Sequence, residues 1–246
     1  TLNEIVKEDT GYLSNFSTIF IGKQIPLVLK KVKVQLKKNK SKIIYPGTWK
    51  LIKIRNSFYY QDKNNKIKLN NKDIHSRGMK ENVCLAIKVA LDLNINRRII
   101  KKALPSLKFK GRFQYIKKGK ILNKLHKKET FMIDGAHATA DAKNLAYFLR
   151  SVNIPKYGIW AMTKNKEPSL FIKQLEGIFK KVVTMPIKNE NSFSARELCK
   201  IAAQSKIDTE EASNLKNALT KISSKKRKLI VCFGSLYNCA NILNQN

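Results

Sequence analysis

The feature that most constrains the fold is a strand–helix alternation over residues 108–246, in which the strand-like runs are apolar throughout. After its first residue, the run Lys228–Phe233 is apolar at every position. Strands of this kind occur where both faces of a sheet are covered, as in parallel sheets between helices. The C-terminal part of the chain is therefore predicted to be an α/β domain with a mostly parallel sheet.

The spacing of apolar residues gives the expected elements of this part. The Lys118-Gly119 pair predicts a basic hairpin over 110–125, and Ser194 with Glu197 has the spacing of a capping box, which marks a helix start. We expect strands at 130–133, 157–162, 182–185 and 229–233, and helices at 140–151, 169–179, 194–203, 210–222 and 235–243.

Residues 1–107 have a different pattern. Apolar residues recur at helical spacing over 24–38 and alternate with polar residues over 48–69, which predicts a helix and then a β meander. Further elements are expected as strands at 17–21 and 43–45 and helices at 81–93 and 95–104. This is a smaller α/β part, with too few strands to form a complete domain.

The charge is lopsided, with 50 Lys and Arg against 17 Asp and Glu and a formal net charge of +33. Of the basic residues 42 are Lys and 8 are Arg. Arg is the residue suited to bidentate phosphate and base contacts, so this composition favours a lysine-coated surface over a nucleic-acid partner. A basic nucleic-acid-binding α/β protein is the alternative.

Several other classes are excluded or disfavoured. No run approaches the ~20 apolar residues of a membrane span. The scattered cysteines Cys84, Cys199, Cys232 and Cys239 form no CxxC pair and the three His lack zinc-ligand spacing, so no metal site is expected. Reduced cysteines are typical of a cytoplasmic protein, and we expect a monomer.

Two predicted strand ends carry residues suited to binding. Asp134-Gly135 follows the strand 130–133, and Gly234-Ser235 follows the strand 229–233, each just before a helix. Ligands of open α/β sheets bind at such carboxyl ends, and phosphates bind at helix N-termini. The alternative is that Asp134 only caps the next helix and that Gly-Ser is an ordinary N-cap.

Taken together, the motifs resemble the folylpolyglutamate synthase/dihydrofolate synthase family of the Mur ligase superfamily. Upstream, Glu81–Ala86 is similar to the family's Glu-Asn-Ala-x-x-Ala helix, and Leu2–Glu8 to the segment before its carbamylated lysine. The C-terminal strings, in the family's order, are Gly111-Arg-Phe-Gln114, Ile133-Asp-Gly-Ala-His137, Pro186-Ile187, Glu190-Asn-Ser-Phe-Ser-Ala195 and Gly234-Ser-Leu-Tyr237.

The resemblance implies a two-part architecture. Residues 108–246 would be the Rossmann-like C-terminal (glutamate ligase) domain, and residues 1–107 a remnant of the central ATP-binding domain. It also implies an ATP-dependent ligase that uses Mg²⁺. A carboxylate of the folate or dihydropteroate substrate attacks the γ-phosphate of ATP, and the amine of L-glutamate displaces phosphate from the resulting acyl phosphate.

Four residues match family positions. Asn82 matches an adenine-side contact, Arg112 an interdomain arginine that reaches the nucleotide phosphates, and Asp134 an ATP contact. His137 matches a nearby histidine and is the candidate catalytic residue. A guanidinium can neutralise charge on a transferring phosphoryl group. The structural alternatives are a surface ion pair for Arg112 and a packing role for His137.

The sequence also departs from the family. These 246 residues contain no GxxxxGK[ST] phosphate loop, and Asp9 stands where the family has its modified lysine. Phosphoryl transfer depends on positioning and charge stabilisation, so we expect a truncated ligase that is inactive alone. A second alternative is a non-catalytic partner that completes another chain's ATPase half.

Overall fold

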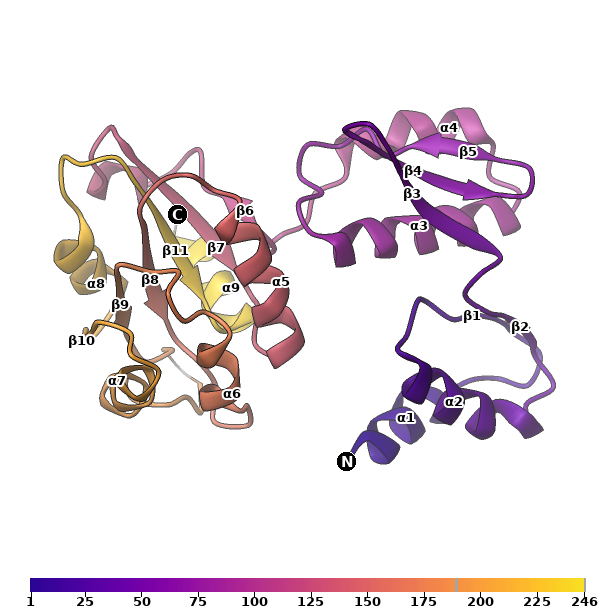
Figure 1. The fold of residues 1–246 in the computed structure, drawn as a ribbon, viewed down its shortest axis with the longest axis horizontal. Coiled ribbons are helices and arrows are strands. Elements are labelled where there is room, and N and C mark those ends of the chain that lie inside the picture. The colour runs from indigo at the N-terminus through magenta and orange to yellow at the C-terminus, as the bar shows by residue number, and fades with distance from the viewer. Residues whose placement is uncertain (189, 246) are drawn as a thin grey trace. The chain divides into compact units, whose positions relative to one another are not determined.

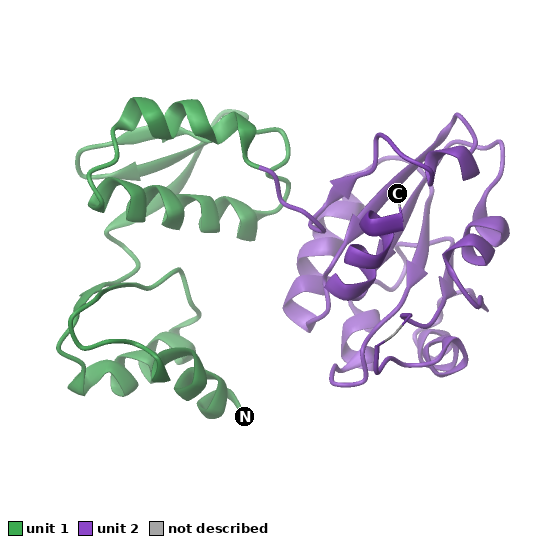
Figure 2. Cartoon of the chain, turned by 180° about the vertical axis from the view of Figure 1, so that it is seen from behind, with its two compact units in different colours: residues 1–107 green, residues 108–246 purple. Residues whose placement is uncertain are grey.

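The computed structural model describes residues 1–188 and 190–245, and it divides into two compact units. Unit 1 comprises Thr1–Leu107 and unit 2 comprises Lys108–Asn246 (Figure 2). Each unit has its own sheets and helices, and they are described separately. Among the described residues, no helix combines the length and apolarity needed to cross a bilayer.

Unit 2 is built on a six-stranded sheet with strand order β10-β9-β8-β11-β7-β6 (Figure 1). All neighbouring strands pair in parallel except β6, which pairs antiparallel with β7. The strands are β6 (Gln114–Tyr115), β7 (Glu129–Asp134), β8 (Lys156–Trp160), β9 (Lys181–Thr184), β10 (Thr209–Glu211) and β11 (Lys228–Phe233). The prediction of a mostly parallel α/β sheet is confirmed.

Helices cover both faces of this sheet. On one face, α8 and α9 contribute Leu219 and Ile242 to a core cluster with Ile159 and Cys232. Trp160 and Phe233 are the next residues along their strands, so they point to the opposite face, where they stack on Phe171 of α6. There α6 packs against α5 and α7. The helices are α5 (Thr139–Arg150), α6 (Pro168–Lys173), α7 (Ala195–Gln204), α8 (Leu215–Ile222) and α9 (Leu236–Gln245).

The position of β11 explains its continuous apolar run. It lies between β7 and β8, so both its edges are paired and helices cover both its faces. Every residue of β11 is buried. Ser194 and Glu197 form the predicted capping box at the start of α7.

Two local expectations are wrong. Residues 110–125 do not pair with each other: β6 pairs with β7 across a loop that contains only the short 3-10 helix Leu122–Lys124. Residues 209–211, expected to begin a helix, form the edge strand β10, and the helix starts at Leu215 after an Asn214 cap. In both cases pairing with a neighbouring strand overrides local propensity.

Unit 1 contains two small sheets. In one, β1 (Thr18–Phe20) and β2 (Lys42–Ile44) pair in parallel, accompanied by α1 (Leu2–Gly11) and α2 (Pro26–Gln35). The other is the predicted antiparallel meander of β3 (Trp49–Ile54), β4 (Ser57–Asp62) and β5 (Lys66–Lys68). The remaining helices are α3 (Arg77–Asp92), α4 (Arg97–Ala103) and the 3-10 helices Leu36–Lys38 and Leu104–Ser106.

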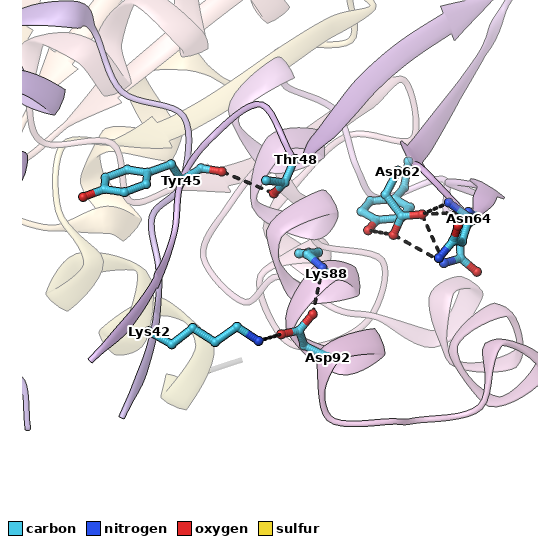
Figure 3. Close-up of polar contacts among 9 residues, drawn as sticks. Lys42, Tyr45, Thr48, Asp62, Asn64, Lys88 and Asp92 are labelled. Carbon is cyan, nitrogen blue, oxygen red and sulfur yellow. Dashed lines mark hydrogen bonds and ion pairs between the residues drawn. The ribbon is translucent and has the colours of Figure 1, made fainter. Parts of the chain in front are cut away.

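Polar contacts support the turns of unit 1 (Figure 3). Asp62 closes the turn after β4 by accepting hydrogen bonds from the backbone N–H groups of Asn64 at 2.9 Å and Asn65 at 2.7 Å. Asp92 at the end of α3 pairs with Lys88 at 2.7 Å and lies 4.0 Å from Lys42 of β2.

The first sheet of unit 1 is sparsely covered. A parallel pair of three-residue strands is below the size that is stable by itself. None of the ten residues of α2 is buried, and Leu27 and Val34 are more than half exposed. This part of unit 1 therefore has apolar surface without a full set of packing partners.

Candidate functional site

Asp134, the last residue of β7, organises the first motif. Its side chain is 1% exposed and accepts hydrogen bonds from the backbone N–H groups of Phe113 and Ala136, both at 2.8 Å. Burial raises the pKa of Asp134 to about 6, although these hydrogen bonds and the nearby Arg112 charge act to lower it.

The antiparallel β6–β7 pairing brings the Gly-Arg-Phe-Gln string beside Asp134. Gln114 pairs with Ile133, and the N–H of Gly135 donates to the carbonyl of Gly111. Phe113 has a φ of 45° and Gly111 a φ of 67°, so the string makes a tight turn around the carboxyl group. Two motifs that residues 115–132 separate in the sequence thus form one structure.

The alternative reading of Asp134 as a helix cap is wrong. Helix α5 begins at Thr139, and its N-cap residue is Ala138, for which the structure gives no side-chain capping bond. Asp134 instead holds the segment before β6 to the turn after β7.

Asp141, in the first turn of α5, links the other two candidates. Its Oδ2 lies 3.9 Å from Nη1 of Arg112 and 4.0 Å from Nδ1 of His137. His137 Nδ1 is 2.8 Å from the carbonyl oxygen of Gly135. Since a carbonyl can only accept, Nδ1 is the donor, and in the neutral ring Nε2 is left as an acceptor.

The second motif packs directly on the first. A Cβ added at Gly135 would lie 2.2 Å from Cδ2 of Leu236, the first residue of α9. Gly234 has a φ of 109°, and a Cβ there would lie 2.3 Å from the carbonyl oxygen of Ala161. Both turns therefore require glycine, because neighbouring chain fills the space of a side chain.

A cavity of about 620 Å³ lies at this carboxyl end of the sheet. Its walls come from the loops that follow β7, β8, β9 and β11. The lining residues are His137, Thr163, Asn165, Lys166, Glu190, Asn191, Ser235, Leu236 and Tyr237.

The topology explains why a cavity forms here. The neighbouring strands β7 and β11 are followed by α5 and α9, which pack on opposite faces of the sheet. The connections leave the sheet in different directions, and the crevice between them is the usual ligand position in open α/β sheets.

Two loops of the cavity wall are joined by backbone contacts. Thr163 forms a β-bridge with Ser192, and the N–H of Lys164 donates to the carbonyl of Asn191 at 3.0 Å. The Nζ atom of Lys164 lies 3.9 Å from a carboxylate oxygen of Glu197. These contacts fix the segment after β8 against the segment after β9.

The four predicted site residues are distributed unequally. Arg112, Asp134 and His137 lie together at the end of β7, and His137 lines the cavity. Asn82 is exposed on α3, in the other unit. Three residues of the Gly234-Ser-Leu-Tyr237 string, Ser235, Leu236 and Tyr237, also line the cavity, and sequence reasoning missed Thr163, Asn165 and Lys166. Their position directly after predicted strands was the available signal.

The described residues were compared with the donor sets that hold metal ions in proteins. Across residues 1–188 and 190–245, no group of three or more His, Cys, Asp or Glu side chains could hold a metal. All four cysteines are free thiols, and burial raises the pKa of the Cys232 thiol to about 12. The structure therefore assigns no metal ligand to this site.

Comparison with known proteins gives consistent results. The family described as dihydrofolate synthetase, C-terminal domain, matches residues 117–245. A search of curated proteins finds no match.

Solved structures match almost the whole chain. Mycobacterium tuberculosis folylpolyglutamate synthase complexed with ADP and AMPPCP has a TM-score of 0.82 at 17% identity, over 99% of this chain and 60% of that one. Thermotoga maritima folylpolyglutamate synthase has a TM-score of 0.73 at 19% identity, over 99% and 57%. Escherichia coli FolC in complex with DHPP and ADP has a TM-score of 0.79 at 14% identity, over 98% and 56%.

At these identities the solved structures establish the fold, and the present chain spans less than two thirds of their length. The family match covers more than half of the chain and coincides with the unit that holds the cavity. The chain thus belongs to the family described as dihydrofolate synthetase, C-terminal domain, and it has the fold of the folylpolyglutamate synthases.

Proposed function

We propose that this chain is the C-terminal part of an ATP-dependent ligase that adds L-glutamate to folates, with dihydrofolate synthesis as a further reaction of the same site. The observation that carries the proposal is the cavity at the β7/β11 crevice, which His137 lines and next to which Arg112 and Asp134 lie at the end of β7. A positively charged group beside helix N-termini suits an anionic nucleotide or acyl phosphate.

Each residue has a proposed part. Arg112 neutralises charge on the nucleotide phosphates, and its weak ion pair with Asp141, whose side chain is a third exposed, leaves it able to change partner. Asp134 contacts ATP or positions the turn that does, through its two backbone hydrogen bonds. His137 acts at the reacting groups with Nε2, and Asn82 contacts the adenine from the ATPase part.

The proposed domains coincide with the two units. Residues 108–246 are the glutamate ligase domain, and residues 1–107 are part of the central ATP-binding domain. The sequence without a phosphate loop and the sparsely covered sheet of unit 1 support this assignment. Mg²⁺ would be held by ATP and by residues of the ATP-binding domain that this chain does not contain. A cytoplasmic, monomeric protein is proposed with it.

The exposed apolar surface of α2 in unit 1 favours a second candidate function. In it, the chain is a non-catalytic subunit that completes an ATPase half carried by another chain. The exposed apolar residues of α2 are the specific observation. In both cases this chain alone would not turn over ATP, because its residues do not include the phosphate loop that positions the nucleotide.

Nucleotide binding is tested by titrating the ¹⁵N-labelled chain with ADP and following the backbone amides. We expect progressive shifts at Gly135, His137 and Ser235, and a weaker affinity in Arg112→Ala. Arg150→Ala is the matched control, because Arg150 is an exposed arginine in the last turn of α5, away from the cavity-lining residues. Shifts that spare the β7 and β11 turns would contradict the proposed site.

Turnover is tested separately with the unmodified chain, a reduced folate, L-glutamate and Mg·ATP. We expect no glutamate-dependent release of ADP. Release that depends on glutamate would show that the chain is a complete ligase, and it would refute the proposed need for a phosphate loop from elsewhere.

A further inference from the structure

A group of basic residues in unit 2 lies at the end of the sheet opposite the cavity. Three loops lead into the neighbouring strands β7, β11 and β8: residues 116–128, 223–227 and 151–155. We call these loops the amino-end loops. They contain nine basic residues and no Asp or Glu: Lys117, Lys118, Lys120, Lys124, Lys127, Lys128, Lys225, Lys226 and Arg227.

The other end of the same strands carries fewer basic residues. The loops 135–138, 161–167 and 234–235, which follow β7, β8 and β11, hold two lysines, Lys164 and Lys166, and one acid, Glu167. The segment 108–113, which lies beside the end of β7, adds Lys108, Lys110 and Arg112. The nine basic residues of the amino-end loops thus compare with five at the carboxyl end, where an acid is also present.

The amino-end loops are held together by buried contacts. Glu129 accepts hydrogen bonds from the N–H groups of His126 at 2.9 Å and Ser224 at 2.7 Å, one from each of the two most basic loops. The N–H of Leu229 donates to the carbonyl of Pro155 at 2.9 Å, which joins the third loop. Since neighbouring strands lie ~4.8 Å apart, the loops that lead into β7, β11 and β8 are neighbours, and their charges add in one region of the surface.

We propose that the amino-end loops bind the phosphate backbone of a nucleic-acid duplex without reading its sequence. This interaction is separate from the proposed ligase site, which lies at the other end of the strands. Lysine supplies mobile point charges that suit phosphate contacts, and the single arginine of the loops gives little capacity for base recognition.

The chemistry of the loops disfavours other polyanions. Proteins that bind single-stranded nucleic acid combine a basic groove with exposed aromatic rings on which bases stack. Stable attachment to a membrane needs a second signal besides basic residues, such as inserted apolar side chains or a lipid chain. In the described part of unit 2, the large exposed apolar side chains are Tyr147, Leu170, Leu236 and Tyr237, which belong to α5, α6 and α9. A rigid duplex requires neither feature.

The test is fluorescence anisotropy with a mixed-sequence DNA duplex and the full chain, between about 50 and 200 mM salt. We expect saturable binding. The logarithm of the association constant should fall linearly with the logarithm of the salt concentration, with a slope of about −0.9 for each phosphate contact. The variant with Lys120, Lys124, Lys127 and Lys225 changed to Gln is expected to lose at least about tenfold in affinity and to show a shallower slope.

The matched control changes Lys143, Lys173, Lys200 and Lys216 to Gln, which removes the same charge from exposed positions on α5, α6, α7 and α8. It is expected to bind within about twofold of the unmodified chain, with the same salt slope. Circular dichroism confirms that both variants are folded.

Three outcomes would overturn the proposal. Equal losses in the two variants would mean that net charge, and not the amino-end loops, determines binding. Tighter binding to single strands or to anionic vesicles would assign the loops to another partner. Absence of saturable binding at the lowest salt would remove the interaction altogether.

Discussion

The two ends of β7 each carry a buried carboxylate, and their surroundings differ. At the start of the strand, Glu129 has a cation 3.7 Å away, Lys228, and further hydrogen bonds from the Ser223 hydroxyl and two backbone N–H groups. At the end, Asp134 has two backbone donors and no lysine or arginine in contact among the described residues.

This difference separates a closed end of the strand from a more open one. The Glu129 cluster is closed, because Lys228 also donates to the carbonyl of Ile222 and covers the ring of Tyr157 at 4.4 Å. At the other end, a cavity lies beside the turns that follow β7 and β11, and the pKa of Asp134 is raised to about 6. A carboxyl group with a raised pKa next to a cavity is a candidate for a functional site.

The largest predicted effect is at the closed end. Glu129→Ala leaves Lys228 buried without its counter-charge and should lower the free energy of unfolding by roughly 3–5 kcal/mol. Urea denaturation measures the loss. Replacing the pair together, with Glu129→Leu and Lys228→Met, should restore most of it, and a single variant within about 1 kcal/mol of wild type would show that the pair is dispensable.

The next effect is a pH dependence at the open end. The folded pKa of Asp134, about 6, lies above its ordinary value of 3.8, so the folded protein binds more protons between these values. Stability should fall as pH rises from about 4 to about 6, by up to roughly 3 kcal/mol, and should then level off.

Urea denaturation at several pH values in this window measures the effect, with Asp134→Asn as the comparison. The variant should show a flatter profile than wild type, since position 134 no longer titrates. Parallel profiles would place the proton uptake at other groups.

A smaller effect is expected where the two turns meet. Gly135→Ala places a methyl group in the space of Leu236 and should cost about 1–3 kcal/mol. Gly11→Ala is the control, because no atom lies within 4 Å of its added Cβ, and it should change stability by less than about 0.5 kcal/mol. Thermal unfolding of both variants, followed by circular dichroism, checks the contrast. Equal effects would mean that the turn can relax.

The smallest effect is expected for Asp141→Asn. Oδ2 of Asp141 lies 3.9 Å from Nη1 of Arg112 and 4.0 Å from Nδ1 of His137. The three side chains are about a third exposed, so solvent screens both interactions. Urea denaturation should show a change below about 1 kcal/mol. A larger loss would place Asp141 among the structural carboxylates with Glu129.

The order of strands and helices follows from the sequence, because continuous apolar runs such as 229–233 have one physical explanation, burial on both faces. The exceptions are short strands whose partners are distant. Thr209–Glu211 contains two glutamates, a helix-favouring signal, and becomes a strand only because β9 lies beside it. The two-residue β6 is defined by its pairing with β7.

The candidate site was predictable in part. Asp134 and His137 stand at the end of an evident strand, and the family motif adds Arg112. The cavity wall around Asn165, Lys166 and Asn191 depends on how separate loops meet, which no local pattern encodes. Nor does the sequence distinguish Asp134 as a cap from Asp134 as a link to Phe113.

The contact between Gly135 and Leu236 has an evolutionary consequence. The two residues are 101 positions apart in the sequence and occupy adjoining space, so a change at one restricts the other. A relative with a larger residue in place of Gly135 should carry a smaller one in place of Leu236. Substitutions at these two positions should therefore be correlated, and an insertion in either turn should be rare unless the other turn has changed as well.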